Sequence, residues 1–247
     1  MNKPEASLAW LARHHFGKVR AASFVVCACP ALWLFGEWWA DALGINPLNR
    51  LLHFTGRWAL IMLTVTLAVT SVRRLSVRLS QAVHARYGKR LADWNWLIRL
   101  RRQFGLFTFF YACLHLAVYV AFDVGLDLRS IRDDALERPF VFVGFAAFAL
   151  LVPLAATSNQ AAMRALGKAW RRLHMLSYLV AILGIVHFWL QAKVGDTRAM
   201  PYTFVLAVLL VSRLRGRWLG ERGFGGEVEE RPPRLAQPTV TSVPRTD

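Results

Sequence analysis

Long apolar stretches are the feature that most constrains how this chain can fold. A helix needs about 20 mostly apolar residues to cross a hydrocarbon core roughly 30 Å thick. Stretches that approach this length recur along the 247-residue chain, at 20–40, 51–72, 103–122, 139–156, 173–191 and 200–214. The last is the shortest, and it needs the flanking Met200 and Arg213 to span. We therefore predict an all-α membrane protein, a bundle of six transmembrane helices.

Composition and charge agree with a membrane location. Hydrophobic residues make up 55% of the chain, and the mean hydropathy is +0.34. The formal net charge of +16 is high enough to suggest nucleic acid. However, the basic residues lie between the apolar stretches and do not gather on one soluble face, which argues against that partner. Their position is typical of loops beside anionic membrane lipid.

The loops predict the orientation. Arginine and lysine are abundant in the connections 73–102 and 157–172, and positively charged loops remain on the cytoplasmic side. The connection 123–138 mixes both signs and is expected on the opposite side. Both termini are then cytoplasmic, with a cytoplasmic segment over 1–19, a membrane domain over 20–215 and a disordered tail over 216–247. Residues 80–98 fit a short helix on the inner membrane surface and a solvated loop equally well.

Four of the seven histidines lie in or at the ends of the predicted spans, and they need an explanation: His53, His115, His174 and His187. An ionisable side chain in hydrocarbon usually faces the interior of the bundle and has a partner there. Neutral imidazole is an axial ligand of haem iron, and two imidazoles on neighbouring helices hold a porphyrin between them. The three cysteines form no CxxC or CxxCH pattern, which argues against zinc, iron–sulfur and c-type haem sites.

Depth in the membrane decides which histidines can meet. Counted from the inner side, His115 lies about 12 residues, or roughly 18 Å, into the third stretch. His187 lies about 14 residues, or roughly 20 Å, into the fifth. Both stretches run outward, so the two histidines are level. We predict that His115 and His187 are the ligands of one b-type haem near the outer side.

His174 lies near the inner edge, 13 residues and roughly 19.5 Å from His187. The third stretch offers no histidine at that depth, because the corresponding position holds Arg101. On a straight helix His174 and His187 would also lie some 140° apart, so sharing one groove needs a distortion, for which Gly184 is a candidate. Two interpretations of the inner site stay open. In the first, the chain holds one haem and an inner flavin; in the second, it holds a second haem with different ligands.

His53 and Arg57 are four residues apart and share one face of the second stretch. There they could meet a haem propionate, a quinone oxygen or a phospholipid. An equally good interpretation has His53 hydrogen-bonded in the headgroup region while Arg57 extends to the membrane surface.

Five segments make the chain resemble a known family: 53-HFTGR-57, 97-LIRLRRQFGL-106, 114-LHLAVY-119, 157-TSNQAAMRALGKAW-170 and 173-LHMLSYLVAILGIVHFW-189. They resemble the MsrQ family, formerly YedZ, within the ferric-reductase-like transmembrane group. The resemblance covers about residues 20–215. It implies that His115, His174 and His187 occupy the family's haem-associated positions.

The resemblance also implies a function. It implies a multi-pass protein of the bacterial inner membrane that carries haem b and FMN. Electrons would pass from membrane quinol to MsrP, a periplasmic molybdenum-containing subunit that repairs oxidised methionine in periplasmic proteins. The chain would then be an electron-transfer subunit, and we predict no catalytic residue in it. A basic inner surface offers candidates for the FMN phosphate: Arg101, Arg102, Arg171 and Arg172.

Two other functions compete with this one. A ferric or cupric reductase-type cytochrome would pass electrons to an extracellular metal, but such enzymes often carry a fused flavin and nicotinamide domain, for which the segment after 215 is short. A membrane scaffold or transporter without a cofactor would use its histidines for helix contacts or proton relay. That alternative predicts a colourless purified protein.

Overall fold

The computed structural model describes residues 16–82, 95–193 and 195–223, and every regular element in these ranges is helical. The prediction for the tail beyond 223 and most of that for 80–98 lie outside the described residues. The elements are α2 (Phe16–Trp39), α3 (Pro47–Ala82), α5 (Asn95–Val118), the π-helix η1 (Tyr119–Asp123), α6 (Leu128–Glu137), α7 (Pro139–Ala156), α8 (Gln160–Leu166), α9 (Lys168–His174), α10 (Leu176–Gln191) and α11 (Met200–Gly223).

Five helical segments are long and apolar enough to cross a membrane: Phe16–Trp39, Pro47–Leu75, Leu97–Asp123, Pro139–Ala156 and Lys168–Gln191. Each leaves much apolar surface exposed, as expected for side chains that contact lipid. The sixth predicted span corresponds to the first part of α11, where Met200–Arg213 is a shorter apolar helix. The chain is thus an all-helical, multi-pass membrane protein with five candidate spans among the described residues.

The observed helix limits agree with the predicted ones where the length of the apolar stretch sets them. They differ where polar or charged residues continue the helix. α7 has the predicted limits. α3 continues to Ala82, past the predicted end at 72, and α5 already begins at Asn95. α2 begins within the predicted cytoplasmic segment, and α11 continues into the predicted tail. Hydropathy measures only the apolar part of a helix, whereas arginine and serine extend it into water at little cost in helix propensity.

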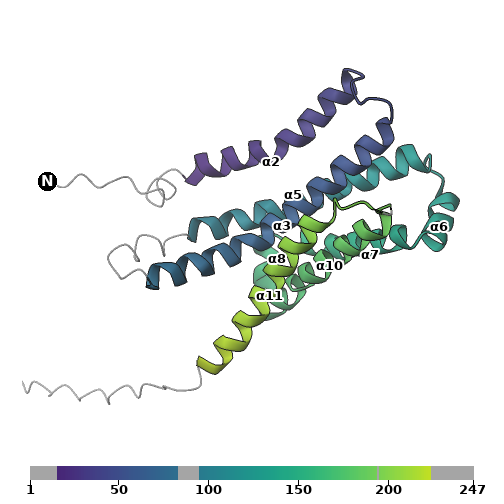
Figure 1. Cartoon of the computed structure of the whole chain (residues 1–247). Helices are drawn as coiled ribbons and strands as arrows, with labels where there is room; N and C mark the ends of the chain where they lie inside the picture. Colours follow the sequence, from purple (N-terminus) through teal and green to yellow (C-terminus); the bar gives the residue numbers. More distant parts are fainter. Residues whose placement is uncertain (1–15, 83–94, 194, 224–247) are drawn as a thin grey trace, which may run out of the picture. The chain divides into compact units, whose positions relative to one another are not determined.

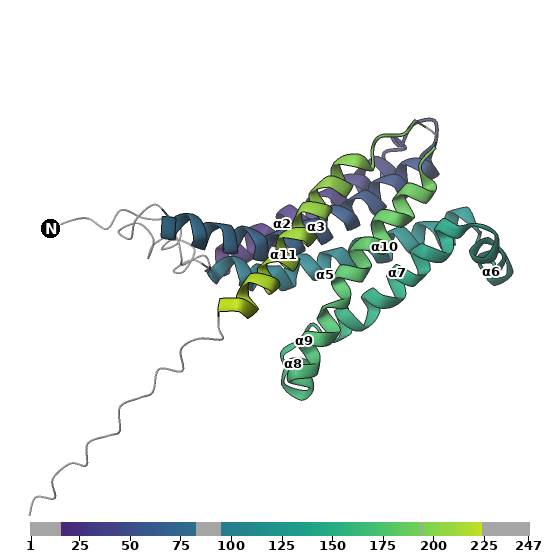
Figure 2. The same ribbon diagram turned by 60° about the horizontal axis from the view of Figure 1, so that its bottom comes forward.

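Two antiparallel helix pairs form the framework: α3 packs along α5, and α7 packs along α10 (Figures 1 and 2). A buried apolar cluster joins these pairs and α11. Its members come from α3, α7, α10 and α11: Leu60, Leu63, Leu67, Leu151, Val180, Ala181 and Leu206. A second cluster attaches α2, where the Tyr111 hydroxyl donates to the carbonyl oxygen of Cys27 at 2.7 Å.

The end of the apolar part of α11 is fixed by Arg213, whose side chain is buried. Its guanidinium donates to the Leu67 carbonyl on α3 and to the Tyr178 hydroxyl on α10. A buried cation that finds hydrogen-bond acceptors on two other helices holds all three helices together. The short connection 192–199 is therefore held between two anchored helices.

The fifth span consists of two helices, α9 and α10, that are separated by Met175 alone. α9 ends at His174 and α10 begins at Leu176, whereas α10 runs without a break through Gly184. The distortion expected at Gly184 is therefore wrong. The boundary between α9 and α10 lies instead at Met175, beside His174, where the backbone keeps helical angles.

Candidate functional site

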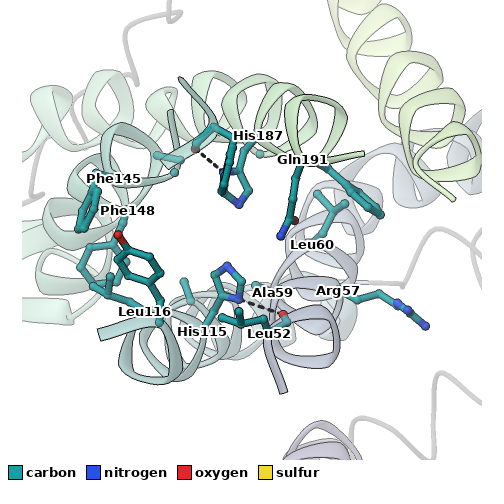
Figure 3. A pocket seen from close by; sticks show the side chains of 18 of the residues that line it. Leu52, Arg57, Ala59, Leu60, His115, Leu116, Phe145, Phe148, His187 and Gln191 are labelled. Carbon is teal, nitrogen blue, oxygen red and sulfur yellow. Dashed lines mark hydrogen bonds between the residues drawn. The ribbon is translucent and has the colours of Figure 1, made fainter. Parts of the chain in front are cut away.

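A cavity of about 250 Å³ lies between the α3–α5 pair and the α7–α10 pair (Figure 3). Its walls are mostly aliphatic and aromatic side chains. Packed protein interiors contain few voids larger than a water molecule, which takes up about 30 Å³ in the liquid. A space of this size within the bundle is suited to a ligand with an extensive apolar surface.

Two histidines face each other across this cavity. His115 projects from α5 and His187 from α10, and Figure 3 shows both rings directed into the open space from opposite sides. Their ring centres are 6.0 Å apart, and the ring planes are at 85°. The structure thus brings together the two residues that depth in the membrane predicted to be level. Their role as haem ligands stays a prediction.

Backbone carbonyls fix the proton on each ring. His115 Nδ1 donates to the Leu52 carbonyl at 3.1 Å and lies 3.2 Å from the Thr55 hydroxyl. His187 Nδ1 donates to the Phe140 carbonyl at 2.7 Å. A carbonyl oxygen can only accept, so Nδ1 carries the hydrogen in both residues. The lone pair on Nε2 is then free to bind a metal.

A glycine on the neighbouring helix makes room for each ring. A β-carbon at Gly56 on α3 would lie 3.1 Å from Cε1 of His115. A β-carbon at Gly144 on α7 would lie 2.9 Å from both Cε1 and Nδ1 of His187. These contacts are tighter than side chains normally make. The two helix pairs therefore repeat one arrangement, in which a histidine on one helix packs against a glycine on the other.

The spacing of the rings fits an iron held between two imidazoles. A metal–imidazole bond is about 2.0–2.1 Å long, so two imidazoles on opposite sides of one metal would have ring centres roughly 6 Å apart. The observed 6.0 Å agrees with this requirement. The cavity walls suit the apolar faces of a porphyrin, and the two Nε2 atoms would hold its iron. The residues present therefore fit a haem.

His174 has different surroundings and does not line the cavity. Its Nε2 lies 3.1 Å from the Thr157 hydroxyl, and its ring stacks on Trp170 with centres 4.0 Å apart. The Trp170 indole also donates to the Thr157 carbonyl at 3.0 Å. Its Nε2 is thus engaged by a hydrogen bond, and this histidine joins α9 to the end of α7.

Charged and polar groups gather at the mouth of the cavity. His53 and Arg57, the predicted pair on α3, both line it, although Figure 3 shows the Arg57 guanidinium directed away from the opening. Arg198 also lines it and is paired with Asp196 in the 192–199 loop. Hydrogen bonds from the Arg198 side chain and backbone amide lower the pKa of Asp196 to about 2. This ion pair is fully formed at neutral pH.

The four arginines predicted to hold the FMN phosphate lie on α5 and α9, and their role stays a prediction. Arg101 is half-buried and interacts electrostatically with Arg213 and His174. Arg102, Arg171 and Arg172 have exposed side chains, and no described hydrogen bond or ion pair links them to Arg101. Of the four, Arg101 alone lies among groups that the fold holds in place.

Several cavity residues went unrecognised in the sequence. Gln191 lies one helical turn beyond His187 and therefore shares its face, a signal that the spacing carried. Gly56 stands inside the 53–57 segment, but nothing in the sequence shows which ring packs against it. Arg198 had no signal either, because a loop arginine has no periodicity that points it toward a helix bundle.

Comparison with known proteins gives a consistent result. The family model described as "Ferric reductase like transmembrane component" matches residues 55–185. A protein of Herminiimonas arsenicoxydans named "Protein-methionine-sulfoxide reductase heme-binding subunit MsrQ" is 43% identical over 181 residues, which cover 72% of this chain and 76% of that protein. A protein of the same name from Ralstonia nicotianae is 42% identical, over 83% of this chain and 88% of its own length. One from Bordetella pertussis is 41% identical, over 82% of this chain and 91% of its own length.

The family model includes His115 and ends two residues before His187, and the relatives match 72% to 83% of the chain. In this chain, identity above 40% over more than 200 residues is accompanied by an all-helical fold with five candidate membrane spans among the described residues. The chain belongs to the MsrQ family of ferric-reductase-like transmembrane proteins.

Proposed function

We propose that this chain is a membrane electron-transfer subunit that holds one haem b between His115 and His187. The observation that carries the proposal is the pair of facing imidazoles, each with Nδ1 bonded to a backbone carbonyl and Nε2 directed into an apolar cavity. The printed name of its relatives, a heme-binding subunit of a protein-methionine-sulfoxide reductase, supports the same cofactor.

The chain's residues determine how such a site works. The carbonyls of Leu52 and Phe140 fix the ring orientations and make each imidazole a stronger ligand. His115 and His187 would both hold the iron, and binding by two imidazoles would favour electron transfer over the binding of a small molecule. Apolar walls keep water away and thereby influence the reduction potential. Haem bound there supplies reversible one-electron chemistry at its iron.

We place this subunit between membrane quinol and the periplasmic molybdenum-containing subunit MsrP. A quinol releases two electrons and two protons, and a methionine sulfoxide takes up the same number to give methionine and water, so the two reactions balance. The family name supports a methionine-sulfoxide reductase as the acceptor. The identity of the donor rests on the resemblance alone.

The protein would lie in the bacterial inner membrane, with α11 as a sixth span and both termini in the cytoplasm. Charge supports this orientation, because the carboxylates with described side chains belong to the connections at one end of the bundle or to the helix ends beside them: Glu37, Asp41, Asp123, Asp127, Asp133, Asp134, Glu137 and Asp196. Arginine and lysine dominate the connections at the opposite end, as expected for the cytoplasmic side.

FMN is proposed as a second cofactor on the inner side, beside Arg101. The half-buried guanidinium of this residue, close to His174 and Arg213, supports an anion-binding position for the flavin phosphate. Arg102, Arg171 and Arg172 would add positive charge around that position.

The test is the reduced-minus-oxidised visible spectrum of the purified full-length chain, with haem and flavin quantified per chain. We expect a low-spin haem in the wild type that is lost in His115→Ala and His187→Ala, and a loss of flavin in Arg101→Gln. His174→Ala is the matched control, since this histidine does not line the cavity and should leave that haem in place. Full haem content in both cavity variants, or a colourless wild type, would overturn the proposal.

A further inference from the structure

Among the described residues, three side chains with a formal charge line the cavity, and all of them lie level with the facing histidines or beyond them toward the loops. Arg57 is adjacent to Gly56, which contacts His115, while Asp123 ends η1 and Arg198 lies in the 192–199 loop. The opposite part of the wall consists of uncharged side chains such as Leu63, Leu151 and Val180. The cavity thus has an apolar inner part and a charged mouth.

Arg198 is held at this mouth by its own loop. Its Nε donates to both oxygens of Asp196, at 2.9 and 3.0 Å, and its Nη2 donates to one of them at 2.6 Å. The backbone amide of Arg198 adds a fourth bond to Asp196 at 2.9 Å. Asp196 is the more buried partner, with 12% of its side chain exposed against 57% for Arg198. The arginine therefore retains exposed donor capacity next to the cavity.

A second donor lies close to the same mouth. Gln191 follows His187 by one helical turn, and Figure 3 shows its side chain directed into the open space between the histidines. No described hydrogen bond engages its amide. His53 lies near enough to Arg198 and Arg57 to interact with both electrostatically. Guanidinium and amide donors at one end of an apolar cavity match a flat ligand that has carboxylates along one edge.

We propose that Arg198, assisted by Gln191, binds a propionate carboxylate of the haem at the mouth of the cavity. Asp196 is a positioning residue, which orients Arg198 without touching the ligand itself. The inference rests on the proposed haem site and adds the orientation of the haem within it. The carboxylate edge of the haem would face the 192–199 loop, and its apolar edge would face Leu63 and Leu151. A carboxylate carried into a membrane bundle needs such a partner, because an unpaired buried charge is strongly disfavoured.

The experiment compares Arg198→Gln, Arg198→Lys and Arg132→Gln in the full-length chain. Arg132 is a matched control, because it pairs with an aspartate on the same side of the bundle, is exposed and does not line the cavity. Haem loss to excess apomyoglobin and the reduction midpoint are measured for each. Loss of a charge-assisted hydrogen bond should accelerate haem loss about tenfold in Arg198→Gln. The midpoint should fall, since a nearby cation favours the reduced form, and Arg198→Lys should lie between.

A porphyrin without carboxylates separates ligand contact from a general structural effect. The full-length chain is reconstituted with haem or with haem dimethyl ester, whose propionates are uncharged. Wild type should retain haem longer than the ester, and this preference should shrink in Arg198→Gln and, less strongly, in Asp196→Asn. An unchanged preference, or equal behaviour of Arg198→Gln and Arg132→Gln, overturns the inference. A wild type without haem would instead refute the proposed function.

Discussion

His187 and His174 lie on consecutive helices, 13 residues apart, yet their surroundings differ in almost every respect. Opposite His187, α7 presents a glycine and a backbone carbonyl, so the ring is seated against the helix with Nε2 free. Opposite His174, the end of α7 presents Thr157, whose hydroxyl meets Nε2 directly, and Trp170 covers the ring. The facing residue therefore determines how a membrane histidine is used.

Gly144→Ala changes the surroundings of His187, and it should have the largest effect on haem binding. The new β-carbon would lie 2.9 Å from the His187 ring, so the ring must move. Overpacking of this kind costs about 1–3 kcal/mol, which corresponds to roughly 5-fold to 150-fold in haem affinity. Haem content and dissociation rate give the measurement. Gly36→Ala on α2, with open space around the new methyl group, is the control that should leave both unchanged.

The equivalent change at Gly56 should have a smaller effect of the same sign. Its β-carbon would lie 3.1 Å from the His115 ring, a contact that a shift of a few tenths of an ångström can relieve. We expect a few-fold loss of haem affinity and a measurable change in the low-spin signal. If Gly56→Ala lowers the haem affinity more than Gly144→Ala does, the His115–Gly56 and His187–Gly144 contacts do not repeat one arrangement.

Thr157→Val should affect the His174 region and leave the cavity intact. The substitution keeps the shape but removes the hydroxyl that meets His174 Nε2 and donates to the Pro153 carbonyl at 2.6 Å. An unpaired, partly buried nitrogen costs about 1–3 kcal/mol, which should lower the thermal midpoint in detergent. The spectrum of the His115–His187 haem should remain that of wild type. Loss of this haem would show that the two histidines do not act separately.

The smallest effect concerns pH at the cavity mouth. The pKa of Asp196 is lowered from 3.8 to about 2, so the stability of its ion pair is fully present above the unfolded value and disappears as the pH falls toward 2. Wild type and Asp196→Asn should therefore differ by a constant amount between about pH 7 and pH 5 and converge only near pH 2. Thermal midpoints across this range give the comparison. Convergence already near pH 5 would contradict the low pKa.

Sequence reasoning was most successful where one physical quantity decides the outcome. Apolar length alone determined α7, and the rise per residue of a helix placed His115 and His187 at one level. It was less successful where polar residues continue a helix into water, as in α3 beyond residue 72 and α11 beyond residue 215. The predicted distortion at Gly184 was wrong, because α10 is continuous through this glycine, and the helix boundary lies at Met175 beside His174.

The sequence by itself determined an apolar, multi-pass helical bundle and the pair of histidines that meet inside it, because span length and depth are properties of single helices. Only the tertiary structure decided what each ring packs against, which nitrogen keeps its lone pair, and that Arg198 lies at the mouth of the cavity. Those features depend on contacts between helices distant in sequence, and helical periodicity alone does not specify them.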